Sequence, residues 1–238
     1  MTRVCVAIET AGSHLGLGLY DVSGGDAKRL ALSFEPEQGR QSDRIIPLLQ
    51  SLLKASRLTK RDIGLIAVDY GPGSFTGVRV GVSVARALAQ GLDKPIVGVC
   101  GLEALAREDH FGNGARVAAC LPALPGDVYF AIFKAGSWDS IVAPSWGTEQ
   151  KFLDALAGFR DGEVINVVGM VAPSLAPKLA GLTNVNLAAR GRAAHPDWIA
   201  SAAIQRFDPK APRARTRFDS VIPLYLQPSW AERTQRGA

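Results

Sequence analysis

The stretch between residues 62 and 90 constrains the fold more than any other part of the chain. An apolar run of strand length leads into a loop with two glycines and a proline, and helical periodicity follows the loop. Glycine adopts positive φ at little cost, proline fixes its own φ, and a hydroxyl side chain can cap a helix. The sequence therefore predicts a strand, a tight turn and a helix. The loop residues are Gly71, Pro72, Gly73, Ser74, Phe75 and Thr76.

The glycine loop has two interpretations. It could bind an anion, because free backbone amides and the helix dipole both favour negative charge. The Lys-Ser/Thr pair of a phosphate-binding P-loop is absent, however, since Val78 and Arg79 follow Gly77. We therefore favour a structural turn, capped by Ser74 or Thr76, over a phosphate site.

The helix after the loop is apolar around most of its circumference. Small residues recur every four positions from Gly77 to Ala89, and valine and leucine occupy the neighbouring faces. Such a helix must be covered on more than one side. One side would be its own sheet, and a small-residue stripe also lets another helix approach closely. The sequence leaves open whether that helix belongs to the same chain or to a partner.

An earlier helix is a candidate neighbour for this one. It covers residues 45–53, with Ser42 or Asp43 as its cap and a broad apolar arc. Two such helices side by side would form half of a four-helix interface. Gly81→Arg is then expected to abolish pairing and leave the chain folded. The predicted interface residues are Ile45, Leu48, Leu49, Leu52, Gly77, Val78, Gly81, Val82, Ala85 and Ala89.

The order of the predicted elements indicates an α/β fold. Strand-like runs at 4–10, 15–21 and 29–35 precede the first helix, and the runs 62–70 and 95–99 flank the second helix. Strands joined by short turns favour an antiparallel meander, whereas strands separated by helices favour parallel pairing. A mixed sheet flanked by helices is therefore predicted.

A second subdomain is expected after residue 106. The predicted division is 1–106 for the first subdomain and 107–217 for the second, and a tail, 218–230, returns to the first. No internal repeat is visible. The predicted strands of the second part are 116–121, 128–133 and 164–169, and its predicted helices are 149–157 and 196–207.

Several segments of the chain resemble the TsaB (YeaZ) family of bacterial tRNA threonylcarbamoyladenosine biosynthesis proteins. The resemblance implies an actin-like, RNase H-like (ASKHA) α/β fold of two subdomains, each with a mixed sheet flanked by helices. The chain departs from the family pattern at 41–43, where a histidine is missing, and at 123–129, where a charged run is missing. The matching segments are Ala7 to Thr10, Ile45 to Leu49, Gly71 to Leu88, Gly98 to Leu105 and Pro223 to Leu226.

The resemblance also implies a function. Proteins similar to this family are non-catalytic partners that form a heterodimer with TsaD, a related catalytic subunit, and work with the ATPase TsaE. Together they transfer threonylcarbamoyl to the adenosine at position 37 of tRNA, so a scaffold without a cofactor of its own is expected. The residues leave open a stand-alone actin-fold ATP-dependent phosphotransferase or peptidase-like enzyme with Glu9 as general base, and a homodimer built on the same apolar stripe.

The distribution of charge gives a weaker indication of function. The net charge is +5, and basic residues gather late in the chain. Such a run could contact tRNA phosphates, but no aromatic residues are interleaved with it, so a solvated loop is favoured. The candidate tRNA contacts are Lys210, Arg213, Arg215 and Arg217.

Composition excludes several classes of protein. The three histidines, His14, His110 and His195, are far apart in the sequence, so no metal site is predicted. Three cysteines without a Cys-x-x-Cys motif favour reduced thiols in a reducing compartment. No leader and no membrane-spanning run is visible, so a cytoplasmic protein is expected.

Overall fold

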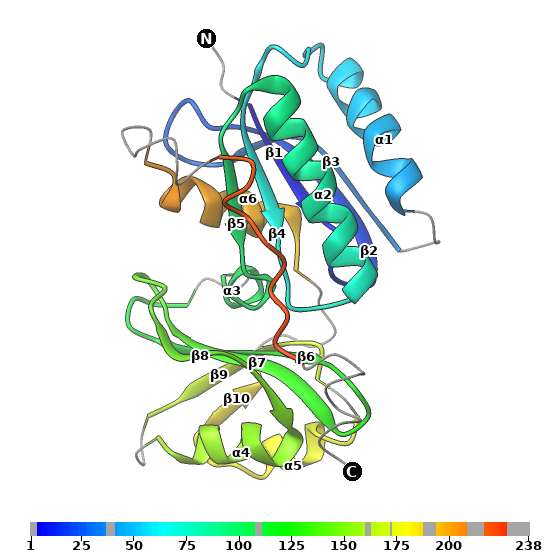
Figure 1. Ribbon diagram of the computed structural model, residues 1–238. Helices are drawn as coiled ribbons and strands as arrows, with labels where there is room; N and C mark the ends of the chain where they lie inside the picture. The colour runs from blue at the N-terminus through cyan, green and yellow to red at the C-terminus, as the bar shows by residue number, and fades with distance from the viewer. Residues whose placement is uncertain are drawn as a thin grey trace.

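Two five-stranded mixed sheets, one above the other in Figure 1, form the two halves of the protein. The computed structural model describes residues 4–36, 41–107, 111–159, 163–171, 173–187, 194–208 and 217–227. The strands are β1 Val4–Glu9, β2 His14–Asp21, β3 Lys28–Pro36, β4 Ile63–Asp69, β5 Ile96–Val99, β6 Arg116–Pro122, β7 Asp127–Lys134, β8 Ser140–Thr148, β9 Ile165–Gly169 and β10 Val185–Leu187. The helices are α1 Gln41–Ala55, α2 Phe75–Leu92, α3 Gly101–Ala106, α4 Glu149–Ala157, α5 Ala176–Ala180 and α6 Pro196–Arg206.

The two sheets share one topology. The first has the order β3-β2-β1-β4-β5 and the second the order β8-β7-β6-β9-β10. In each sheet the first three strands pair antiparallel and the last two add in parallel. The predicted α/β class, with two mixed sheets flanked by helices, is confirmed. The duplication itself was not visible in the sequence.

Strand β1 shows how the core is divided. Its residues alternate between the two faces of the sheet, as the two-residue period of a strand requires. Val4, Val6 and Ile8 pack on the side of α1 and α2, whereas Cys5 and Ala7 pack on the side of α3 and α6. The second of these cores continues into the second sheet, so one apolar layer joins the two halves.

Helix α6 belongs with the first sheet. It contacts β1 and the other four strands of that sheet, and it also packs against α3. The sequence interpretation placed this helix within 107–217 as part of the second subdomain, and the structure corrects that placement. The reason is its buried face of Ile199, Ala200, Ala202 and Ala203, which closes the core beneath β1.

The last described segment, residues 217–227, crosses from the first half to the second, and we call it the strap (Figure 1). Val221 is buried in the core beneath α2, and the amide of Leu224 donates to the carbonyl of Tyr70 over 2.8 Å. At its far end the carboxamide oxygen of Gln227 accepts a hydrogen bond from the hydroxyl of Tyr129. The strap therefore lies over the end of β4, where the glycine loop begins.

Candidate docking site on helices α1 and α2

The glycine loop is held from within the chain. Gly71 has φ +108°, and its amide donates to the carboxyl of Asp69 over 2.7 Å. A Cβ on Gly73 would lie 2.3 Å from the carbonyl oxygen of Ala11, and the amide of Ser74 donates to that same oxygen. The positive φ of Gly71 and the close approach of Gly73 to Ala11 explain why both positions are glycine. Contacts of this kind are typical of a structural turn.

Helix α2 begins with the predicted serine cap. The hydroxyl oxygen of Ser74 accepts a hydrogen bond from the amide of Gly77 over 3.2 Å. This bond satisfies one of the free donors of the first helical turn. Of the two predicted capping residues, Ser74 and Thr76, Ser74 is the one that caps α2.

The small-residue stripe of α2 lies against the chain's own sheet. A Cβ on Gly77 would lie 2.0 Å from the carbonyl oxygen of Thr10, and one on Gly81 would lie 2.2 Å from the Thr10 hydroxyl oxygen. That hydroxyl donates to the carbonyl of Gly77 over 2.7 Å. The stripe thus lets the helix approach the end of β1, and no second helix is needed to fill it.

This packing corrects most of the predicted interface. Eight of the ten predicted residues are buried inside the chain and cannot present a surface to a partner. The expectation that Gly81→Arg leaves the chain folded is also corrected, because the arginine would collide with Thr10. The buried residues are Ile45, Leu49, Gly77, Val78, Gly81, Val82, Ala85 and Ala89.

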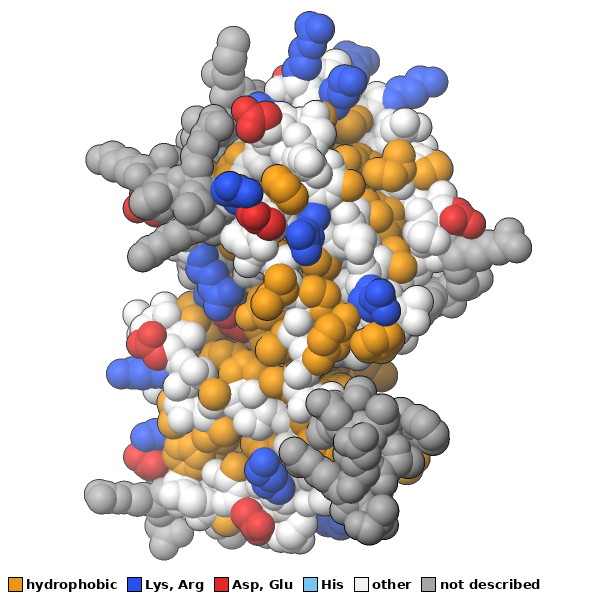
Figure 2. All heavy atoms as spheres, viewed as in Figure 1, with side chains coloured by type: hydrophobic (Ala, Val, Ile, Leu, Met, Phe, Trp, Pro, Cys, Tyr) orange, Lys and Arg blue, Asp and Glu red, His pale blue; other side chains and the backbone are white. Residues whose placement is uncertain are grey.

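The outward face of the two helices is formed by Leu48, Leu52 and residues that were not predicted. Ile46 is 38% exposed, and its neighbours on α1 and α2 are partly buried against the same core. Hydrophobic side chains gather on this side of the molecule in Figure 2, over the region of α1 and α2 in Figure 1. We call this surface the docking face, and its residues are Ile46, Leu48, Leu52, Val80, Val84 and Leu88. Leu48 and Leu52 are the two predicted interface residues that remain available.

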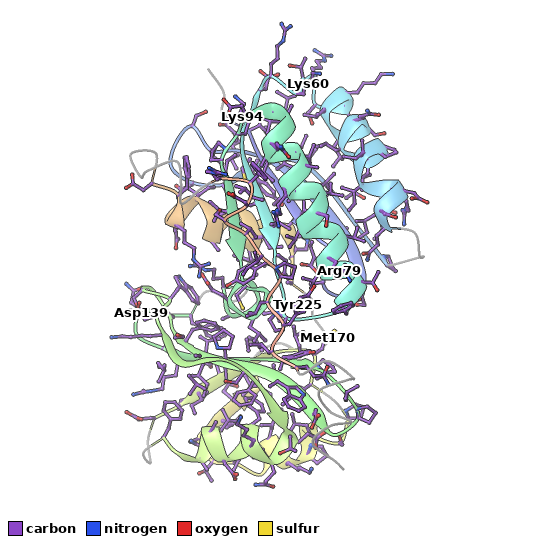
Figure 3. The ribbon with its side chains drawn as sticks, viewed as in Figure 1. Lys60, Arg79, Lys94, Asp139, Met170 and Tyr225 are labelled. Atoms are coloured by element: carbon purple, nitrogen blue, oxygen red, sulfur yellow. The ribbon has the colours of Figure 1, made fainter. Side chains whose placement is uncertain are left out.

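Basic side chains outnumber acidic ones around the docking face. Residues 41–94 carry eight lysines and arginines and four aspartates, of which Asp69 is buried. Helix α2 contains two arginines and no acidic residue. Lys60 and Lys94 lie beyond one end of the two helices, and Arg79 lies near the other end of α2 (Figure 3). An acidic partner surface would complement this rim.

Two carboxyl groups are sealed beneath the glycine loop. Glu9 ends β1 and Asp69 ends β4, and neither is exposed by more than 1%. Burial, together with the neighbouring Asp69, raises the pKa of Glu9 well above its usual range, and burial also raises the pKa of Asp69. The amide of Gly12 donates to Glu9 and that of Gly71 to Asp69, each over 2.7 Å. Burial therefore favours the protonated form of Glu9 and leaves neither carboxyl access to a substrate, which argues against Glu9 as a general base.

This pair predicts a pH dependence of stability. Glu9 binds its proton more tightly in the folded state than in the unfolded state. The contribution of this protonation to stability is therefore complete below the ordinary carboxyl range, and it is lost as the pH rises through the raised folded-state pKa. Each unit of pKa difference corresponds to about 1.4 kcal/mol of unfolding free energy. Glu9→Gln should flatten this decline above the ordinary carboxyl range, as measured by urea unfolding at a series of pH values. An equal slope of stability against pH in both proteins would contradict the raised pKa of Glu9.

The predicted tRNA contacts are only partly within the described residues. Lys210, Arg213 and Arg215 lie outside them. Arg217 forms an ion pair with Asp219 over 2.7 Å, so its charge is compensated locally. The tRNA contact stays a prediction.

Two exposed residues of the strap were not among the predicted site residues. Ile222 is 67% exposed and Tyr225 is 50% exposed, and Tyr225 lies against Phe75 of the glycine loop. The only signal in the sequence was a short apolar run beside Pro223, which looked like a segment returning to the core.

Comparisons with known proteins agree with this architecture. The chain is 36% identical over 130 residues to the tRNA threonylcarbamoyladenosine biosynthesis protein TsaB of Escherichia coli, and 33% identical over 129 residues to TsaB of Bacillus subtilis. The solved structure of YeaZ from Pseudomonas aeruginosa superimposes with a TM-score of 0.73 at 20% identity, covering 94% of this chain and all of that one. Over about half of its length the chain is homologous to the TsaB proteins of E. coli and B. subtilis, and its fold is that of YeaZ.

The match to the family's sequences is concentrated in part of the chain. The aligned region covers 54% of this chain and 54% of each of the E. coli and B. subtilis TsaB proteins, or about half the length of these relatives. A family model described as TsaD, tRNA N6-adenosine threonylcarbamoyltransferase, matches residues 36–153. The fold is that of YeaZ, with two mixed five-stranded sheets flanked by helices, as the TsaB resemblance implied.

Three further observations concern the described residues alone. None of their helices combines the length and the apolar character needed to cross a membrane. No three of their histidines, cysteines and acidic residues gather in a way that could hold a metal ion. The cysteines Cys5, Cys100 and Cys120 are buried and free, and burial raises the pKa of each thiol to about 12. These thiols stay protonated and unreactive at neutral pH.

Proposed function

We propose that this chain is a non-catalytic scaffold of the machinery that forms threonylcarbamoyladenosine in tRNA, and that it acts by forming a heterodimer with a TsaD-like catalytic subunit. The observation that carries the proposal is the docking face, an apolar surface on two adjacent helices with a basic rim. Similarity to TsaB over about half of the chain and the match to the TsaD model support the choice of partner. Exposed apolar surfaces with polar surroundings are typical of protein interfaces.

The non-catalytic part of the proposal is supported by the ends of the parallel strands. In open α/β sheets, ligands bind beyond the carboxyl ends of the strands. Here Glu9 and Asp69 at those ends are buried, and the strap lies over the end of β4 through the bond between Leu224 and Tyr70. The chain's own residues thus occupy the position that a substrate would need.

The other components follow from the family. A TsaE-like ATPase would complete the cytoplasmic assembly, and tRNA would contact this chain weakly, through the basic segment that includes Lys210 and Arg213. No cofactor is assigned to the chain itself. A homodimer of the isolated chain through the docking face would compete with the heterodimer.

Reconstitution tests the proposal. Transfer of threonylcarbamoyl to tRNA is measured with the TsaD-like and TsaE-like proteins of the same organism, with and without this chain. We expect product formation to fall to background when the chain is omitted. Full activity without the chain would overturn the scaffold role.

A second measurement addresses the rival enzymatic function. A stand-alone phosphotransferase of this fold would bind ATP with magnesium, and calorimetry on the isolated chain would detect it. We expect no heat of binding, because the strap and the buried carboxyl pair close the strand ends. Saturable ATP binding at micromolar concentrations would favour the enzyme.

A further inference from the structure

An exposed apolar cluster lies beside the docking face, at the beginning of α2. Phe75 is 60% exposed, and its ring centroid is 5.1 Å from that of Tyr225 in the strap. Ile222, earlier in the strap, is 67% exposed. These three make up three of the eight large hydrophobic side chains that are exposed among the described residues, and we call them the aromatic patch. An exposed patch of this kind marks an interaction surface.

The aromatic patch is built from two segments far apart in the sequence, and both are fixed in place. The glycine loop holds Phe75 through the cap at Ser74, and the strap is anchored on either side of Ile222 by the burial of Val221 and by the amide of Leu224. Anchors on the backbone leave the exposed rings preorganised, which lowers the entropic cost of binding.

A positive charge accompanies the rings. The guanidinium carbon of Arg79 lies 5.2 Å from the centroid of the Phe75 ring, and Figure 3 shows Arg79 and Tyr225 close to each other at this end of α2. Among the described residues no carboxylate pairs with Arg79, and α2 contains no acidic residue. The charge is therefore available to a partner.

We propose that the aromatic patch and Arg79 form a binding hot spot for the TsaD-like subunit, which supplies an apolar side chain next to an acidic one. This inference rests on the proposed function and adds the strap to the docking face. Tyrosine and arginine are the residue types enriched at interface hot spots, and aromatic residues are enriched at interface cores. The acidic side chain would pair with Arg79, as the basic rim of the docking face also requires.

A protein partner fits this patch better than RNA does. Proteins that bind single-stranded nucleic acid place their aromatic side chains along a positively charged groove. From Phe218 to Gln227 the strap carries one charged residue, Asp219, and it is acidic. The rings of Phe75 and Tyr225 also contact each other, with an angle of 33° between their planes. They therefore do not present two parallel ring faces on which nucleic-acid bases could stack.

Calorimetric titration of the TsaD-like subunit into the full chain tests the hot spot. Phe75→Ala and Tyr225→Ala should each weaken binding at least tenfold, whereas Tyr225→Phe should bind like the wild type. The matched control is Ile141→Ala on β8, a residue that is 46% exposed in the second half of the protein, and its affinity should not change. Arg79→Gln should reduce the salt dependence of the affinity, because it removes one charge pair.

The outcomes separate the hot spot from the proposed function. Normal heterodimer affinity in both alanine variants would overturn the hot spot and leave the scaffold proposal standing. Loss of tRNA binding by the assembled complex, with unchanged affinity between the subunits, would also overturn it in favour of RNA. No binding by the wild-type chain would overturn both proposals. Thermal unfolding of each variant tests whether the variant is folded. We expect both alanine variants to fold, because the side chains of Phe75 and Tyr225 are at least half exposed.

Discussion

Gly77→Ala is expected to lower the free energy of unfolding by about 3 kcal/mol or more, as strong overpacking does. The added Cβ would lie 2.0 Å from the carbonyl oxygen of Thr10, a backbone atom that cannot rotate away. Helix α2 would have to move off the end of β1, and the hydrogen bond from the Thr10 hydroxyl to the Gly77 carbonyl would be lost. Urea unfolding of the two proteins measures the difference.

A glycine near the end of the same helix provides the control. A Cβ on Gly91 would meet no atom within 4 Å. Gly91→Ala should therefore raise the free energy of unfolding by up to about 1 kcal/mol, because alanine favours helix more than glycine does. If the two alanine variants changed stability in the same direction, the close approach of α2 to β1 would be contradicted.

Val84→Glu is expected to weaken heterodimer formation at least about 100-fold, or about 2.8 kcal/mol. Val84 lies on the docking face of α2, partly buried against the chain's own core. The variant would place an unpaired carboxylate in an apolar interface and bring it towards an acidic partner, and both effects oppose binding. Titration of the TsaD-like subunit measures the change in affinity.

The same change on the other half of the protein controls for charge. Ala155 is a partly buried position on α4, so Ala155→Glu adds the same side chain away from the docking face. Its affinity for the partner should equal that of the wild type. If both variants weakened partner binding equally, or if neither variant weakened it, the outward face of α2 would not be part of the interface.

The main features of the fold could be predicted from local patterns. Helix α2 follows from its periodicity, the turn before it from Gly71 and Pro72, and the early strands from buried apolar runs. Strand β8 was not predicted, because it is an edge strand without a clear buried face. The shared topology of the sheets was also missed, since it is a repeat of strand order without a repeat of sequence.

The docking face shows the limit of pattern reasoning. A stripe such as Gly77 and Gly81 permits close approach by any backbone, and only the fold reveals that Thr10 occupies that space. The choice of the exposed face was therefore wrong for most residues of α2, although the two helices were correctly expected to lie side by side. Tyr225 could not be placed either, because its contact with Phe75 depends on the path of the strap.

The most direct test of the account is the mass, by light scattering after size exclusion, of this chain alone and mixed with the TsaD-like protein of the same organism. The account predicts a new species with the mass of one copy of each chain, formed by the wild type and lost in Val84→Glu. Two unchanged peaks, with the wild-type chain folded, would contradict the claim that the α1–α2 face docks a catalytic subunit.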